Sequence, residues 1–320
     1  MLPSFRQYAR VRFLSDYYEA SRLAYWVKPF FVGFISARIN HSKSPVVIFW
    51  HRESIEDVWP HISPRVPVMD VVHNSIADSQ KQDAYLNIDM TPRINLRVAV
   101  TEGLRQLLAE RYAANGLNPD LLERVTVTPH CVPLAVQPVQ KTYGTRVVFL
   151  GRDSMEKRFG LFCRIARASR AENLPFTFAA IGPRPQDHPG VERDVHLYGT
   201  IDDVRRLQDI LNESHILLLT SSSEGFPKAV AEAMTFGLVP VATDVGFVRD
   251  YVENRRTGFL ISPEPDQVVE QALDALRMLT DPSLFLQISE QARQQARDAF
   301  DMAAFASAWK QNITVCRRSA

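Results

Sequence analysis

From residue 145 onward, short apolar runs alternate regularly with segments whose apolar residues recur at helical spacing. The runs are rich in β-branched residues, and several are apolar throughout, as expected of strands that are buried on both faces. They lie at 146–151, 176–182, 194–199, 215–222, 239–244 and 258–262. This alternation is typical of a parallel sheet covered by helices on both faces, so it predicts a Rossmann-like α/β domain.

The first half of the chain shows the same pattern less regularly. Strands are predicted at 45–50, 66–75, 96–101 and 124–130. Thr101 is a suitable N-cap for the helix that follows the third of them, and Gly116 is suited to end that helix in a left-handed conformation. Gly237 can end a helix of the second half in the same way. A second, smaller Rossmann-like domain is therefore expected.

A segment that mixes prolines with polar residues, 133–145, separates the two halves. We therefore predict an N-terminal domain over 1–139 and a C-terminal domain over 140–300. Residues 301–320 are predicted to form a C-terminal helix that can cross back to the N-terminal domain.

The composition argues against several classes of protein. The net charge of the 320-residue chain is +1, which gives no reason to expect a nucleic-acid partner. Its three cysteines are far apart, which argues against a disulfide framework or a zinc knuckle and favours a cytoplasmic protein. The start of the chain has arginines where a signal peptide would be apolar, and the most apolar early stretch, interrupted by Lys28 and Pro29, falls short of a membrane span.

The stretch SSSEGFPKAVAEAMTFG places Glu224 before a Gly-Phe-Pro turn and Glu232 inside the helix that follows. The turn comes after a predicted strand, at the edge of a parallel sheet where ligands meet helix N-termini. Gly225 allows a positive φ or the close approach of a ligand, and Pro227 suits the first turn of a helix. The N–H groups of the turn can then face a diphosphate, while each carboxylate can accept hydrogen bonds from a vicinal diol.

A second stretch, FLGRDSMEKRFG, places Arg152 directly after a strand and Lys157 at the start of the next helix. An arginine and a lysine at the carboxyl edge of a strand can neutralise a diphosphate, the first as a planar fork and the second as a point charge. A solvated charged loop is the alternative. The order of strand, loop and helix in the same domain as Glu224 favours the diphosphate site.

Five stretches occur in the order and spacing of glycosyltransferase family 4: GRDSMEK, AAIGPRP, VHLYGTIDDV, SSSEGFPKAVAEAMTFGLVPVATDVG and YVENRRTGFLI. The chain resembles this family mainly over residues 145–300. The resemblance implies the GT-B fold, in which two Rossmann-like domains face each other across a cleft, here with a reduced N-terminal, acceptor-side domain. It also implies retaining transfer of a sugar from a nucleoside diphosphate-sugar to an acceptor hydroxyl of a glycan or glycolipid, in cell-surface polysaccharide or glycolipid synthesis.

The resemblance also assigns roles to residues. Arg152 and Lys157 would grip the donor diphosphate, Glu224 would contact the transferred sugar, and Glu232 would hold the ribose. VVHNS resembles a strand-end histidine motif, so His73 would face the sugar across the cleft; a histidine satisfied within the core is the alternative. The donor-binding residues in full would be Gly151, Arg152, Lys157, Glu224, Gly225, Phe226, Pro227, Lys228 and Glu232. No separate cofactor is expected, and no metal, since the chain has no Asp-x-Asp motif.

Three departures from the family leave other functions open. His130 to Pro133 replace the family's usual Asn-Gly-Val-Asp, no glycine precedes Gly33 where a glycine-rich acceptor loop is usual, and the first half is short. A nucleotide-sugar epimerase or hydrolase on the same fold therefore stays open, as does a non-catalytic nucleotide-sugar-binding subunit.

Residues 1–45 are basic and aromatic, with seven Lys or Arg against two Asp or Glu. This composition suits either the core of the first domain with a solvated basic face, or peripheral contact with anionic lipid at the inner face of a membrane.

Overall fold

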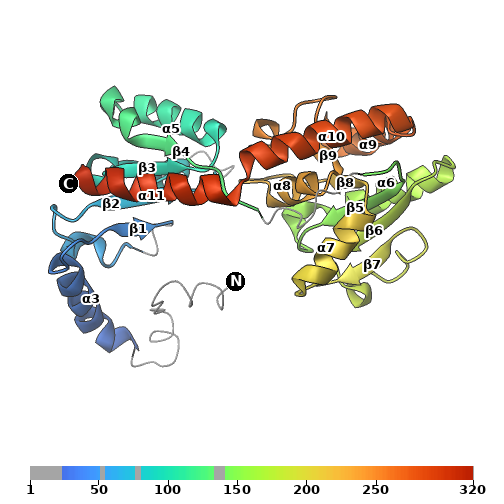
Figure 1. Cartoon of the computed structure of the whole chain (residues 1–320). Coiled ribbons are helices and arrows are strands. Elements are labelled where there is room, and N and C mark those ends of the chain that lie inside the picture. Colours follow the sequence, from blue (N-terminus) through green and yellow to red (C-terminus); the bar gives the residue numbers. More distant parts are fainter. Residues whose placement is uncertain (1–23, 51–54, 76–80, 133–140, 320) are drawn as a thin grey trace.

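The computed structural model describes residues 24–50, 55–75, 81–132 and 141–319. These residues form two parallel sheets, one in each half of the chain, with helices packed against them (Figure 1). Each of the predicted strands contains an observed strand, so the predicted α/β class is confirmed.

The first sheet has four parallel strands in the order in which they occur along the chain. They are β1 (Val47–Phe49), β2 (Val68–Val72), β3 (Leu96–Ala99) and β4 (Val125–Val127). Every residue of β2 and β3 is buried. Helix α3 (Ala24–Asn40) precedes this sheet, and α4 (Gln82–Tyr85) lies between β2 and β3. In the part of the chain that the structure describes, no helix has both the length and the apolar character needed to cross a membrane.

Helix α5 (Glu102–Ala114) begins and ends as the sequence predicts. The Thr101 hydroxyl accepts a hydrogen bond from the Leu104 N–H at 3.1 Å, which makes Thr101 the N-cap. At the other end Gly116 has φ +64°, and the Leu117 N–H donates to the Tyr112 carbonyl at 3.0 Å. This glycine-terminated hydrogen-bond pattern satisfies carbonyls that the helix itself leaves unpaired.

The second sheet has six parallel strands in the order β10-β9-β8-β5-β6-β7. They are β5 (Arg146–Leu150), β6 (Thr177–Ile181), β7 (His196–Gly199), β8 (Ile216–Leu219), β9 (Val239–Thr243) and β10 (Phe259–Ile261). The helices are α6 (Phe159–Ala171), α7 (Val204–Glu213), α8 (Lys228–Thr235), α9 (Pro265–Met278) and α10 (Pro282–Ala299).

Alternate residues of the central strands face two different core clusters. Val147 and Phe149 of β5 pack in the cluster that includes α6 and α9, whereas Val148 packs in the cluster that includes α7 and α8. Because both faces are covered, strands such as β8 have no exposed residue.

The last helix, α11 (Met302–Arg318), packs on the first sheet although it follows the second in sequence (Figure 1). Its Cys316 is fully buried in the core of the first sheet, and its Asn312 side chain donates to the Thr128 hydroxyl at 2.9 Å. A second cross-contact runs the other way, since the Tyr251 hydroxyl donates to the Val100 carbonyl at 3.0 Å. The carboxyl ends of both sheets are thereby held against each other. The predicted boundary at 133–145 lies partly outside the described residues.

Candidate active site

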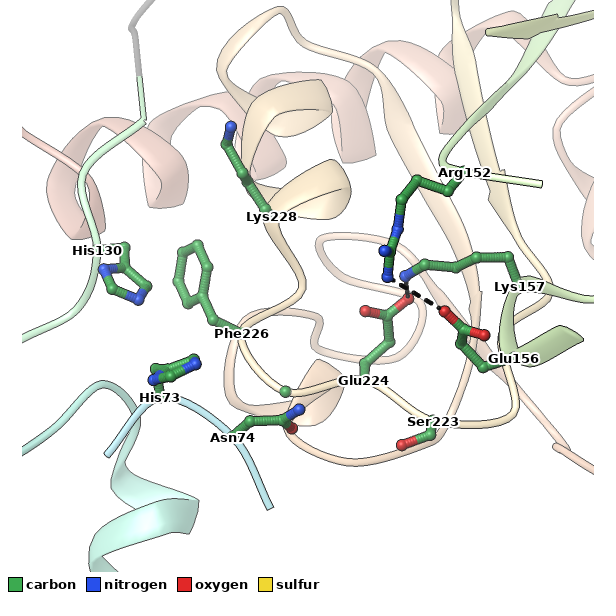
Figure 2. A pocket seen from close by; sticks show the side chains of 11 residues that line it. His73, Asn74, His130, Arg152, Glu156, Lys157, Ser223, Glu224, Phe226 and Lys228 are labelled. Carbon is green, nitrogen blue, oxygen red and sulfur yellow. Dashed lines mark hydrogen bonds and ion pairs between the residues drawn. The ribbon is translucent and has the colours of Figure 1, made fainter. Parts of the chain in front are cut away.

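A cavity of about 380 Å³ opens between the carboxyl ends of the two sheets (Figure 2). Its lining comes from the segments that follow strands β2, β4, β5 and β8 and from the start of α8. The lining residues are His73, Asn74, His130, Arg152, Glu156, Lys157, Ser223, Glu224, Gly225, Phe226 and Lys228. Residues predicted independently from the two halves of the sequence thus meet in one place.

Glu224 lies at the centre of this cavity and is only 8% exposed. Its Oε1 accepts hydrogen bonds from the Lys157 ammonium and from the Ser221 hydroxyl, both at 2.6 Å. The lysine and the glutamate therefore form a largely buried ion pair in which each charge is compensated. Neither bond uses Oε2, which lies toward the middle of the cavity in Figure 2.

The loop after β5 supplies an exposed cation beside this pair. The Arg152 side chain is 84% exposed, and its guanidinium lies 3.4 Å from Oε1 of Glu156. The Ser154 hydroxyl donates to the same oxygen at 2.7 Å, and this hydrogen bond lowers the pKa of Glu156. Because a long exposed ion pair is weak, Arg152 can turn toward an anionic ligand at little cost.

Lys157 does not start a helix, as the sequence suggested, but is the last residue of the short 3-10 helix η5 (Met155–Lys157). The next residue, Arg158, has φ +50° and turns the chain into α6. Its guanidinium donates to the carbonyls of Thr220 and Ser221 at 2.6 and 2.9 Å, which ties the loop to the end of β8. This clamp brings Lys157 to Glu224. Arg158 was not among the predicted site residues, because nothing local in the sequence shows where its side chain binds.

The turn at 225–227 differs from the prediction in two details. Pro227 is the N-cap of α8 rather than part of its first turn, since its carbonyl accepts the hydrogen bond from the Ala231 N–H at 3.1 Å. Gly225 does not have a positive φ. Instead, a Cβ at this position would lie 2.4 Å from Oδ1 of Asn74. The glycine is therefore needed for close approach to the first half of the chain.

Two histidines from the first half line the opposite wall (Figure 2). The His130 ring packs edge-on against the Phe226 ring, with centroids 5.0 Å apart. Burial lowers the pKa of His130, and the nearby His73 and Lys228 lower it further, so its neutral form predominates at neutral pH. His130 had been noted only as a departure from the family, and the fold makes it part of the site.

The remaining predicted residues lie near the cavity without lining it. Glu232 is one turn into α8, where its Oε1 lies 3.2 Å from the Lys228 ammonium. Gly151 lines a neighbouring cavity of about 470 Å³ that shares Arg152 with the first. This second cavity lies at the ends of β5, β6 and β7, and its other lining residues are Leu150, Asp153, Ile181, Gly182, Arg184, Asp187, Thr200 and Ile201.

The described residues hold no cluster of three or more His, Cys, Asp or Glu side chains that could bind a metal ion. Cys131, Cys163 and Cys316 are all free.

Comparison with known proteins identifies the second half of the chain. Residues 144–279 match the family described as Glycosyl transferases group 1. This half therefore resembles the glycosyltransferases of group 1. The chain is also 24% identical over 211 residues to an uncharacterized glycosyltransferase of Haemophilus influenzae, an alignment that covers 63% of this chain and 56% of the relative. The chain therefore matches only part of that relative's length.

Two solved structures resemble the arrangement of both sheets and their helices. The pneumococcal O-GlcNAc transferase GtfA, in complex with UDP and GlcNAc, has a TM-score of 0.75 at 19% identity, over 90% of this chain and 60% of that one. Anabaena HepE, in complex with UDP-glucose, has a TM-score of 0.66 at 16% identity, over 88% and 81%. The predicted GT-B fold is thus confirmed, whereas retention and membership of family 4 remain predictions.

Proposed function

We propose that the chain transfers a sugar from a nucleoside diphosphate-sugar to an acceptor hydroxyl, with retention at the anomeric carbon. The observation that carries this proposal is the cavity in which Lys157, Arg152 and Glu224 meet. Two cations beside one oriented carboxylate suit a ligand that combines a diphosphate with a polyhydroxylated ring.

The diphosphate is assigned to the side of the cavity between the β5 loop and α8. Arg152 is exposed and weakly paired, and the Lys157 ammonium lies beside the cavity. The N-terminus of α8 adds backbone N–H groups and the positive end of its dipole. Glu232 then binds the ribose, and the neighbouring cavity that includes Gly151 receives the base.

The sugar is assigned to the space between Glu224 and His73. The difficult feature of the reaction is charge, because the leaving diphosphate becomes more negative while the sugar becomes oxocarbenium-like. Arg152 and Lys157 stabilise the leaving group. Oε2 of Glu224 accepts hydrogen bonds from sugar hydroxyls, and the departing phosphate takes the proton of the acceptor. Glu224 orients the sugar and does not attack it.

Side chains and helix N–H groups compensate the charge of the diphosphate, so we expect activity without a divalent cation. Transfer should persist after dialysis against EDTA. Complete loss of transfer, restored by added magnesium or manganese, would contradict this part of the mechanism.

The complexes of GtfA with UDP and of HepE with UDP-glucose make uridine diphosphate sugars the first donors to test. A thermal-shift screen of nucleoside diphosphates and their sugars comes first, because a ligand that binds only the native state raises the melting temperature. Mass analysis of products with and without acceptor then separates transfer from epimerisation and hydrolysis. Tight donor binding with no turnover would instead indicate a non-catalytic binding subunit.

For the acceptor, we propose a cell-surface glycan or glycolipid that is reached at the cytoplasmic face of a membrane. Residues 1–23 lie outside the described residues, but α3 carries Phe30 and Phe34, 80% and 60% exposed, with the Arg38 guanidinium 5.8 Å from the Phe34 ring. Basic and aromatic side chains on one surface suit an anionic leaflet. Flotation with anionic and with neutral liposomes, at low and high salt, tests this contact; a chain that never floats would refute it.

A further inference from the structure

The two halves of the chain touch at Gly225, next to the catalytic glutamate. A Cβ on Gly225 would lie 2.4 Å from Oδ1 of Asn74, 2.6 Å from its Cγ and 2.9 Å from the carbonyl oxygen of His73. Asn74 is held in place, since its Oδ1 accepts a hydrogen bond from the Ser75 N–H at 2.8 Å and its side chain is hydrogen-bonded to Tyr85. The contact is therefore between the backbone of Gly225 and the side chain of Asn74, which its hydrogen bonds hold in place.

A second glycine makes the same kind of contact in the opposite direction. Gly103, in the first turn of α5, faces the second half of the chain, where a Cβ would lie 2.5 Å from Cδ1 of Phe247. Its N–H donates to Oδ2 of Asp250 at 2.9 Å. Each half thus contributes one glycine to the surface where the halves meet.

The backbone conformation at these two positions does not itself require glycine. Gly103 and Gly225 are absent from the residues with positive φ, so an L side chain would be unstrained at both positions. What excludes a side chain at each is the neighbouring half of the chain. Glycine is therefore required at both positions because the two halves of the chain approach each other so closely.

We propose that Asn74 is a positioning residue that docks on Gly225 and so fixes His73 across the cavity from Glu224. This inference rests on the proposed function in that His73 and Glu224 hold the sugar. Because the carbonyl of His73 belongs to the same contact, any widening at Gly225 moves His73 directly. The contact between Gly103 and Phe247 is a second point at which the two halves of the chain pack against each other.

The size of the effect follows from the distances. An ordinary van der Waals contact begins at 3.4 Å, so a methyl group on Gly225 must push Asn74 away by about 1 Å. A misplacement of this size in a reacting complex can lower the rate by about 100-fold. The diphosphate site should be untouched, since Arg152, Lys157 and α8 all belong to the second half.

The test compares Gly225→Ala with Gly160→Ala. Gly160 is a matched control because it lies in the first turn of α6 and a Cβ there would meet nothing within 4 Å. For Gly225→Ala we expect UDP affinity within about threefold of wild type and kcat for transfer lower by about 100-fold. Adding Asn74→Ala should restore part of kcat, because it removes the atoms at 2.4 and 2.6 Å. It should not restore all of it, because the His73 carbonyl oxygen at 2.9 Å remains and His73 loses the side chain that positions it. Gly103→Ala tests the other contact and should also retain UDP affinity while losing kcat.

Hydrogen–deuterium exchange separates this proposal from the proposed function. Exchange at residues 72–75 and 98–104 should rise in Gly225→Ala and stay at the wild-type level in Gly160→Ala, whether or not any donor supports transfer. Unchanged exchange together with wild-type kcat in Gly225→Ala would overturn the proposal. It would also be overturned if UDP affinity fell as far as kcat, or if Asn74→Ala gave no rescue.

Discussion

Removing the charge of Lys157 should destabilise the protein as well as inactivate it. Its ammonium lies 2.6 Å from Oε1 of Glu224, and the two side chains are only 17% and 8% exposed. In Lys157→Met, the carboxylate would keep the Ser221 hydroxyl as a partner but lose its charged one. A hydrogen bond to a charged group contributes about 1.5–3 kcal/mol, and a buried charge without its partner costs more.

We therefore expect Lys157→Met to lower the free energy of unfolding by about 2 kcal/mol, which corresponds to a fall in melting temperature of roughly 4–8 °C for a domain of this size. Transfer should fall by about 10²-fold, as when one preorganised transition-state donor is removed. Thermal unfolding by circular dichroism and steady-state turnover at saturating donor measure the two effects.

A double variant separates the two effects. Lys157→Met with Glu224→Gln leaves no buried charge unpaired, so stability should return to within about 1 kcal/mol of wild type. Activity should stay low, because the charge at 157 and the carboxylate are both missing. Lys310→Met, at an exposed position of α11, is the control and should match wild type in both assays. A wild-type melting temperature in Lys157→Met would contradict this expectation, and so would a double variant as unstable as the single one.

Three other results are expected. Arg152→Ala should reduce turnover by about 10²-fold at unchanged melting temperature, because its side chain is 84% exposed; a large loss of stability would show a structural role. Glu232→Ala should weaken the binding of UDP itself, whereas Glu224→Ala should chiefly weaken the binding of the sugar donor. Equal losses of affinity for both ligands in both variants, measured by calorimetry, would contradict this division of roles between the two glutamates. Burial and two neighbouring cations lower the pKa of His215 to about 4, so its neutral form is favoured on folding. Stability should therefore be full above pH 6.5 and fall by roughly 2 kcal/mol toward pH 4, allowing for partial exposure, and His215→Gln should flatten this dependence. Parallel curves for wild type and variant would refute it.

The strands and their order along the chain follow from the sequence. A strand buried on both faces needs a short, continuous apolar run, and that requirement is local, so β8 is visible in its four consecutive apolar residues. The helix ends at Gly116 and Gly237 follow for the same reason, since a left-handed residue after a helix favours glycine. The sequence also predicted that Arg152, Lys157 and Glu224 lie near a ligand, because the loops after parallel strands share one edge.

Only the tertiary structure decided how these residues meet. Lys157 and Glu224 are 67 positions apart, and their contact depends on the Arg158 clamp, which no local pattern predicts. The same is true of Asn74 and His130, whose place in the cavity depends on how closely the two sheets approach. The sequence suggested that Gly225 makes room for a ligand, whereas the fold shows that it makes room for Asn74. A glycine in the sequence can indicate that a position has no room for a side chain. Which atoms occupy the space beside it depends on residues far away along the chain.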